Sequence, residues 1–385
     1  MTSLRHDEGR GRGTKSCTNT DLRMVVRMRR WTRTVLLLLL SLMLGLPATA
    51  AWAGGSKVRV VRPGESIQAA IDAASPGDTI LVKPGTYAEA LVVQTDDLTL
   101  KGSKGTVLTM PDSADNICTQ LSGGTVVGIC ALGEINPETF EVIEYLDGPR
   151  ISGFTIRGFS DSGIIALATD RLQAIGNRAE DNAGYGIFSI LSTRPLLAHN
   201  KATGNGDAGL YVGGEQDVRA RVFANTSWDN PIGIFLRDVS NGSATGNNVF
   251  GNCTGMLLLA NAPGPVTNWK VRHNLVRANN KTDCGEEDPA PSGSGILLWG
   301  ASDNEVSRNL VVGNRGEEPF GGGIVLVTAE AEEPGGAAIA PSGNVVRRNV
   351  ALRNRPFDIS WDGTGTGNRF VDNLCRTSRP EGLCD

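Results

Sequence analysis

The chain has 385 residues, of which 40% are hydrophobic, 5% are aromatic and 49 are glycine. This composition supports a large core but argues against a helical bundle, because so many glycines indicate many tight turns. Residues 1–53 carry nine of the 37 bases and three of the 41 acids, so the remainder has a net charge of −10. An acidic chain is a poor candidate for nucleic-acid binding, which relies on clustered basic side chains, although a local basic groove is still compatible with it.

The segment from Arg27 to Ala53 predicts export. A basic stretch, RMRRWTRT, precedes the apolar run VLLLLLSLMLGL and an A-x-A cleavage motif that ends at Ala53. The apolar run from Val35 to Leu46 is shorter than the ~20 residues that a membrane-spanning helix needs. We therefore expect a secreted protein, cleaved after Ala53 and not held at a membrane afterwards.

Residues 54–385 predict a single elongated domain. Its expected parts are an N-terminal cap (58–77), the first coils (78–110), an inserted loop (111–149), the repeat coils (150–373) and a C-terminal cap (374–385). In the N-terminal cap, Ile67, Ala70, Ile71 and Ala74 form one apolar face of a short predicted helix. Such caps cover the open ends of a repeat structure, whose unpaired edges invite aggregation.

The repeat is marked by two asparagines five residues apart, followed by a glycine and an apolar strand. The asparagine pairs are Asn177/Asn182, Asn200/Asn205, Asn225/Asn230, Asn247/Asn252, Asn274/Asn279, Asn309/Asn314 and Asn349/Asn354. The strands are GIIAL at 163, GIFSI at 186, GLYV at 209, GIFL at 233, GMLLL at 255, GILLW at 295 and GIVLV at 323. Self-similarity at a period of a few tens of residues is typical of a solenoid.

Short strands separated by Gly, Asn and Asp turns predict coils whose strands stack in parallel on the coils above and below. Asparagine tolerates the left-handed turn conformation, and its amide can bond to the same position of the next coil. The asparagines therefore have a structural explanation that needs no catalysis. Longer spacings predict loops inserted at 284–294, 315–323 and 328–342.

The opening PGESIQAAIDAASPGDTILVKPGTY and the repeated N-x4-N…G-[ILM] pattern resemble the right-handed parallel β-helix proteins of the pectin-lyase-like superfamily. The similarity is greatest to the branch of NosD-like, carbohydrate-binding and sugar-hydrolase repeat proteins. It spans nearly all of residues 58–373 and implies an all-β fold. It implies little about activity, because this fold hosts lyases, hydrolases, epimerases, adhesins and proteins of no known activity.

Six cysteines follow the leader and allow 15 pairings. Proximity in the sequence favours Cys118–Cys130, Cys253–Cys284 and Cys375–Cys384. Disulfides agree with an oxidising compartment. No metal or other cofactor is expected, because zinc motifs are missing and the candidate calcium ligands occupy different positions from coil to coil, as solvated turn residues do. A calcium site stays an alternative without support from the sequence. The candidate aspartates are Asp161, Asp181, Asp207, Asp217, Asp229 and Asp238.

The catalytic motifs of the resembled enzymes are not in this sequence. The Gly-His-Gly and Arg-Ile-Lys elements of polygalacturonases are missing. Tyr185-Gly186-Ile187 begins like the motif of mannuronan C5-epimerases, but the acid, proline, histidine and aspartate that follow there are replaced by Phe188-Ser189-Ile190. Without an acid or base at these positions, the epimerase chemistry is not predicted.

Strand alternation predicts a surface instead. If the first and third residues after each strand glycine point inward, the second points outward, which places Phe188, Tyr211 and Phe235 on successive coils ~4.8 Å apart. With Glu215 beside them, these rings are the predicted sugar-binding residues. The predicted acid/base residues are Asp217 and Asp238, and the predicted charge-neutralising residues are Arg219 and Arg237. Alternatively, the loop 111–149 covers the column and no groove exists.

We therefore expect a secreted, monomeric β-helix protein that recognises a polysaccharide or oligosaccharide. If it is an enzyme, a polysaccharide lyase or glycoside hydrolase is the expected class. The competing expectation is a non-catalytic structural or surface-interaction protein.

Overall fold

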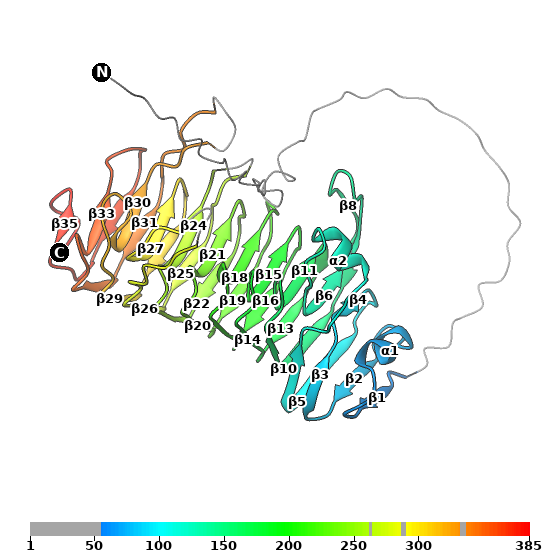
Figure 1. Ribbon diagram of the computed structural model, residues 1–385. Helices are drawn as coiled ribbons and strands as arrows, with labels where there is room; N and C mark the ends of the chain where they lie inside the picture. The colour runs from blue at the N-terminus through cyan, green and yellow to red at the C-terminus, as the bar shows by residue number, and fades with distance from the viewer. Residues whose placement is uncertain (1–54, 262–263, 286–289, 332–335) are drawn as a thin grey trace, which may run out of the picture.

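In the computed structural model, residues 55–261, 264–285, 290–331 and 336–385 are described. The predicted leader and its cleavage site after Ala53 lie outside these residues. Successive coils stack along one axis, with α1 near one end and β35 near the other (Figure 1). Within the described part of the chain, no helix is long and apolar enough to span a membrane.

An 11-stranded parallel sheet forms one side of the stack, and it contains the strands that follow the repeat glycines. Its members are β4 (Leu91–Val93), β6 (Ile129–Leu132), β11 (Ile164–Leu167), β15 (Ile187–Ile190), β18 (Ala208–Gly213), β21 (Ile232–Arg237), β24 (Thr254–Leu259), β27 (Ser294–Trp299), β30 (Gly322–Val327), β33 (Ile359–Trp361) and β35 (Ser378–Arg379).

The other side is a 20-stranded sheet, in which most coils contribute two short strands joined by an asparagine turn. It begins with β1 (Val58–Val61), β2 (Thr79–Val82), β3 (Gly85–Ala88), β5 (Thr99–Thr109) and β10 (Arg150–Arg157). The strands before the asparagine turn are β13 (Gln173–Ile175), β16 (Leu196–Ala198), β19 (Arg221–Phe223), β22 (Ser243–Thr245), β25 (Lys270–Arg272), β28 (Glu305–Ser307), β31 (Val345–Arg347) and β34 (Arg369–Val371). Those after it are β14 (Arg178–Glu180), β17 (Lys201–Thr203), β20 (Thr226–Trp228), β23 (Asn248–Phe250), β26 (Leu275–Arg277), β29 (Leu310–Val312) and β32 (Val350–Leu352).

The remaining elements lie in the cap and in the insertion. Helix α1 (Ile67–Asp72) begins at Ser66, whose hydroxyl accepts a hydrogen bond from the Ala69 amide, and it buries Ile67 and Ile71 as its apolar face predicts. The insertion contributes helix α2 (Ile117–Leu121), the antiparallel pair β7 (Glu134–Ile135) and β8 (Val142–Glu144), and β9 (Leu146–Asp147), which pairs with β12 (Thr169–Asp170).

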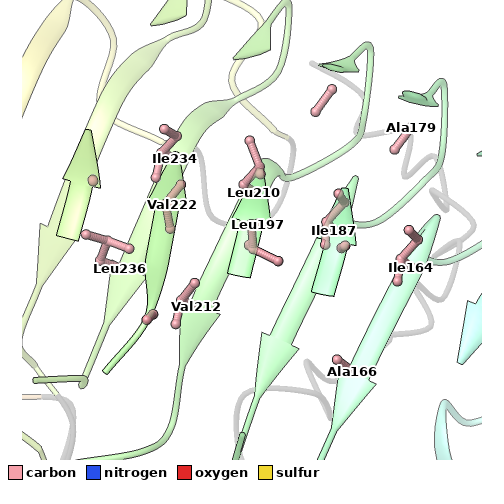
Figure 2. Close-up of a cluster of buried hydrophobic side chains, with 14 of the residues drawn as sticks. Ile164, Ala166, Ala179, Ile187, Leu197, Leu210, Val212, Val222, Ile234 and Leu236 are labelled. Carbon is pink, nitrogen blue, oxygen red and sulfur yellow. The ribbon is translucent and has the colours of Figure 1, made fainter. Parts of the chain in front are cut away.

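The strand register confirms the predicted alternation. Ile164, Ile187, Leu210 and Ile234 are paired partners in neighbouring strands and are buried in the main core, as Figure 2 shows. The second row of inward residues is also buried, namely Ala166, Ser189, Val212, Leu236 and Leu258. The core therefore runs as columns along the inside of the stack, and each coil buries its apolar residues against its neighbours.

The asparagine ladders also form as predicted. The backbone N–H of Asn177 donates to Oδ1 of Asn200 at 2.9 Å, and the backbone N–H of Asn200 donates to Oδ1 of Asn225 at 2.9 Å. The second ladder links Asn205 to Asn230 and Asn230 to Asn252 in the same way. These side chains are buried and satisfy backbone groups at turns that would otherwise lack partners.

All three disulfides pair as sequence proximity favours: Cys118–Cys130, Cys253–Cys284 and Cys375–Cys384. The first attaches α2 to β6, the second attaches an inserted loop to the residue before β24, and the third closes the C-terminal segment. The fold is thus a parallel β-helix with an N-terminal capping helix and disulfide-stapled loops.

Candidate functional site: the outer face of the 11-stranded sheet

The predicted aromatic column lies on the outer side of the 11-stranded sheet. Phe188 on β15, Tyr211 on β18 and Phe235 on β21 are register partners. Their ring centroids are 4.7 Å apart for Phe188 and Tyr211, and 5.1 Å apart for Tyr211 and Phe235. The rings belong to a second apolar cluster, separate from the main core, so the predicted outward direction is confirmed.

The column is not the open, flat stripe that the sequence suggests. Only 6% of Tyr211 and 7% of Phe235 is exposed, whereas Phe188 is partly exposed. The planes of Tyr211 and Phe235 are inclined by 85°, so they offer no continuous stacking surface. Tyr211 also lies along its own strand, because a Cβ at Gly213 would be only 2.3 Å from its hydroxyl oxygen.

The loop 111–149 does not cover these aromatics, in contrast to the alternative expectation. It packs instead one coil earlier, where Cys118 and Leu132 form a cluster with Ile165 and Leu167. At the far end, the later inserted loops place Phe320 and Ile339 against the same column. Phe188 lies between these two covered regions and is partly exposed, whereas Tyr211 and Phe235 on the following coils are buried.

Tyr185 adds a fourth ring to the aromatic column, although the sequence analysis assigns it no role. It precedes β15, and its ring stacks on Phe188 with centroids 4.5 Å apart and planes inclined by 23°. Its ring also contacts Tyr211 at a centroid distance of 5.2 Å. Burial, together with the charge and hydrogen bond of Asp207, raises the pKa of Tyr185 well above its ordinary value. The phenol is therefore a neutral hydrogen-bonding group at physiological pH.

Charged residues surround this ring. Arg237, at the end of β21, forms an ion pair with Asp238, with 3.4 Å between Nε and Oδ2 and little exposure of either side chain. The positive charge of Arg237 acts on the Tyr185 phenol in the direction opposite to Asp207. Asp207, Arg237 and Tyr185 thus form one partly buried polar group beside the aromatic column. We call Tyr185, Phe188, Asp207, Arg237 and Asp238 the aromatic–acidic patch.

The other predicted pair, Asp217 and Arg219, lies in the turn after β18. Arg219 Nη2 donates to Asp217 Oδ2 at 2.6 Å, and Asn241 Nδ2 donates to Asp217 Oδ1 at 2.7 Å. Hydrogen bonds from Arg219 and Asn241 lower the pKa of Asp217. About half of its side chain is exposed, so the pair is an ionised, solvated contact between two coils.

Glu215 links the patch region to the insertion. The hydroxyl of Tyr145 donates to Oε2 of Glu215 at 3.4 Å, and burial, followed by the charge of Glu215, raises the pKa of Tyr145. This contact extends the insertion to the turn after β18, where the sequence predicted a substrate-binding carboxylate. Among the described residues, no group of three or more His, Cys, Asp or Glu side chains is arranged to hold a metal ion.

Two surface hollows lie elsewhere on the described part of the chain. One lies between α1, β4 and the start of the insertion, beside Gln68, Glu89 and Asp115. Glu89 is already used there, since its carboxylate accepts from the backbone amides of Ile67 and Gln68. The other lies on the 20-stranded sheet beside Glu305 and Arg347, which pair with each other at 3.0 Å.

The family model for the right-handed beta helix region matches residues 162–332 and 220–377, together more than half of the chain. The chain belongs to this family. Its members are built from the same repeated parallel coils that the strand register and the two asparagine ladders display here.

One solved structure supports the fold, and two further structures are similar to a lesser degree. The A-module of the Azotobacter vinelandii mannuronan C-5 epimerase AlgE6 matches with a TM-score of 0.51 and 16% identity, over 81% of this chain and 90% of that chain. The periplasmic alginate epimerase AlgG matches with a TM-score of 0.48 and 15% identity, over 82% and 83%. Pectate lyase Pel9A matches with a TM-score of 0.45 and 13% identity, over 84% and 78%. Among curated proteins, none matches the chain in sequence.

Within this β-helix, sequence reasoning missed Tyr185, Asp207 and Tyr145. The motif that Tyr185 begins is incomplete, and the varying positions of the aspartates near the strands predict that Asp207 is a solvated turn residue. A positional signal was available for both: Tyr185 directly precedes a strand glycine, and Asp207 lies two residues before the next one. Tyr145 had no such signal, because it lies in the insertion.

Proposed function

We propose that this protein is an exported carbohydrate-binding protein whose binding face is the aromatic–acidic patch. The observation that carries the proposal is the contact of Tyr185 and Phe188 beside the Arg237–Asp238 ion pair. An aromatic ring can pack against the apolar face of a sugar, and a few oriented polar groups can then hydrogen-bond the hydroxyls. Tyr211, buried on the next coil, contacts both rings, and Phe235 contacts Tyr211 in turn.

The charges around the patch favour an uncharged glycan segment. Asp207, Glu215 and Asp238 lie on or beside it, against the single guanidinium of Arg237. A polymer with one carboxylate per sugar would meet more negative than positive charge there. The alginate and pectate in the names of the structural neighbours therefore do not decide the ligand of this chain.

Export is supported by three disulfides, which persist in oxidising compartments, and by the predicted leader. The location outside the cell and the monomeric state stay predictions.

Catalysis also stays a prediction. Of the two predicted pairs, only Arg237–Asp238 lies at the aromatic rings. The lowered pKa of Asp217 keeps it ionised, which suits a base or a charge partner and not a general acid. If glycan cleavage occurs, we expect the carboxylate of Asp238 to act at the reacting bond while it is paired with the guanidinium of Arg237.

The proposal is tested by titrating the purified protein with neutral polysaccharides (xylan, mannan and β-glucan) and by assaying the same mixtures for new reducing ends and unsaturated products. Phe188→Ala should weaken binding about tenfold, because it removes a ring that packs on the sugar. Tyr185→Phe should weaken it less, because only the hydroxyl is lost. Phe370→Ala, a partly buried aromatic near the C-terminal end, is the matched control and should bind normally.

If none of the neutral polysaccharides binds, the proposal is wrong. It is also wrong if the Phe188→Ala variant binds them with the same affinity as the parent protein. Either result would favour the second candidate, a non-catalytic rod. One observation already favours that candidate, because Tyr211 and Phe235 are too buried to contact a ligand directly.

A further inference from the structure

The outer face of the 20-stranded sheet carries a concentration of bases that the net charge does not predict. Over four consecutive coils, the middle residue of each three-residue strand is buried and the flanking residues face outward. The outward bases are Lys201, Arg221, Lys270, Arg272 and Arg277, which we call the basic strip. No outward position of these strands, β16 to β26 on this sheet, holds an acid.

Three aromatic residues lie between these bases, at outward positions of β19, β20 and β23. Phe223 is 42% exposed, which is unusual for so large an apolar ring. Trp228 and Phe250 are register partners, with ring centroids 5.9 Å apart and planes inclined by only 4°. They form a parallel stack along the axis of the β-helix.

The stack positions one guanidinium of the strip. Cζ of Arg277 lies 4.3 Å from the centroid of the Phe250 ring, a cation–π contact that fixes one face of the group. The N–H donors lie in the plane of the guanidinium, so they stay available to an anion at its edge. At the other end, Arg178 lies over Trp228 but is engaged with Glu180. Of these two arginines, Arg277 is therefore the one that is positioned to donate hydrogen bonds to an anion.

The bases around Arg277 are exposed, and acids nearby are already engaged. Within the described ranges, no ion pair is seen for Lys201, Arg221 or Arg272. Asp229 pairs with Lys281 at 3.1 Å, and Glu305 pairs with Arg347 at 3.0 Å. The local field over the strip is therefore positive, although the chain as a whole is acidic.

We infer that the basic strip is a second binding surface, for an anionic polysaccharide that runs along the axis of the β-helix. Successive coils repeat every ~4.8 Å. Three of the four coils carry an outward base and the coil of β22 and β23 carries none, so bases recur along the axis every one or two coils. Nucleic acid fits less well, because single strands are held on a series of open aromatic faces. Of the three aromatics here only Phe223 is exposed, whereas the faces of Trp228 and Phe250 are covered by each other and by arginines. This surface is independent of the aromatic–acidic patch: it lies on another sheet and selects the opposite kind of glycan.

The test compares polymers with one backbone: dextran, carboxymethyl dextran and dextran sulfate. Calorimetry with the full protein should detect the two anionic polymers, with affinity that falls as salt rises, whereas any binding of dextran at the aromatic–acidic patch should depend little on salt. Arg277→Ala should weaken binding about tenfold, the effect of one charge-assisted hydrogen-bonding group. Arg277→Lys should retain part of the affinity, because it keeps the charge but loses the planar fork. The double variant Lys270→Ala/Arg272→Ala should also lose affinity.

Arg376→Ala, an exposed arginine in the C-terminal segment, is the matched control and should bind like the parent. Circular dichroism and melting temperatures check that each variant is folded. Binding of dextran sulfate that does not depend on salt, or unchanged affinity in the Arg277→Ala and double variants, would overturn the inference. Tighter binding of duplex DNA than of dextran sulfate at equal charge would reassign the strip to nucleic acid. Phe188→Ala should leave binding to dextran sulfate unchanged, so failure here is distinguishable from failure of the proposed function.

Discussion

The phenol ring of Tyr185 stacks on the ring of Phe188, 4.5 Å away between centroids, and thereby joins a turn to the outer face of the 11-stranded sheet. Tyr185 lies before β15, whereas Phe188 lies within it and aligns with Tyr211 on the next coil. The hydroxyl of Tyr185 interacts with Asp207, which precedes β18. One side chain thus connects two coils, an aromatic column and a carboxylate.

The raised pKa of Tyr185 predicts an alkaline limit to stability. The folded state holds the phenol proton to higher pH than the unfolded chain, in which it leaves near pH 10. The contribution is therefore present below about pH 10 and is lost as pH rises beyond it. Tyr87 and Tyr145 also have raised pKa values and should add to the decline.

Tyr185→Phe should make that decline shallower and should lower stability near neutral pH by about 1 kcal/mol, because the bond to Asp207 is lost. Denaturant unfolding at a series of pH values measures both effects. A decline of equal steepness in the parent and the variant would contradict the prediction.

The ladders predict that a buried ladder asparagine contributes more to the free energy of unfolding than an outward-facing polar side chain does. Asn225→Ala removes Oδ1, which accepts from the Asn200 amide, and Nδ2, which donates to the Leu197 carbonyl at 2.8 Å. Because both backbone groups stay buried, we expect a loss of about 2–3 kcal/mol in the free energy of unfolding. Ser243→Ala, at an outward position of the same sheet, should cost less than about 0.5 kcal/mol. Comparable losses in the two variants would argue against the ladder as a stabilising element.

The covered end of the outer column should behave as a second core. Leu297 on β27 is fully buried, although it faces away from the main core. Leu297→Ala should therefore lower stability by about 2–4 kcal/mol. Leu196→Ala, an outward and partly exposed leucine on β16, is its control and should cost less than about 1 kcal/mol. A mild effect at Leu297 would mean that the later inserted loops do not seal the column.

The disulfide Cys118–Cys130 should stabilise the insertion. Its two cysteines are 12 residues apart, and closing a loop of this size contributes about 2–3 kcal/mol in the chain-entropy model. The double variant Cys118→Ser/Cys130→Ser should exchange the amide hydrogens of α2 faster than the parent. Exchange in β24 should change little, because that strand is several coils away. Uniform acceleration along the chain would contradict a local role.

Much of the fold could be predicted because its determinants are local and repeated. Asn177 and Asn182 recur as pairs at the same offset in each coil, and the residues after Gly186 alternate with a period of two, so turns, strands and faces follow from spacing. The disulfides followed from proximity for the same reason. The site was harder, because Phe188, Tyr211 and Phe235 were correctly placed outside but their exposure depends on neighbours from other coils.

The sequence by itself determined the β-helix, its two asparagine ladders, its inward columns and the outward direction of the aromatic residues, since each arises within one coil and is copied to the next. Only the tertiary structure decided that the insertion covers Ile165 and not Phe188, that Tyr185 and Asp207 meet at the column, and that Arg277 packs on Phe250. These contacts join residues from different coils or from an inserted loop. Their geometry depends on how loops and side chains pack laterally, and no short-range periodicity in the chain encodes that packing.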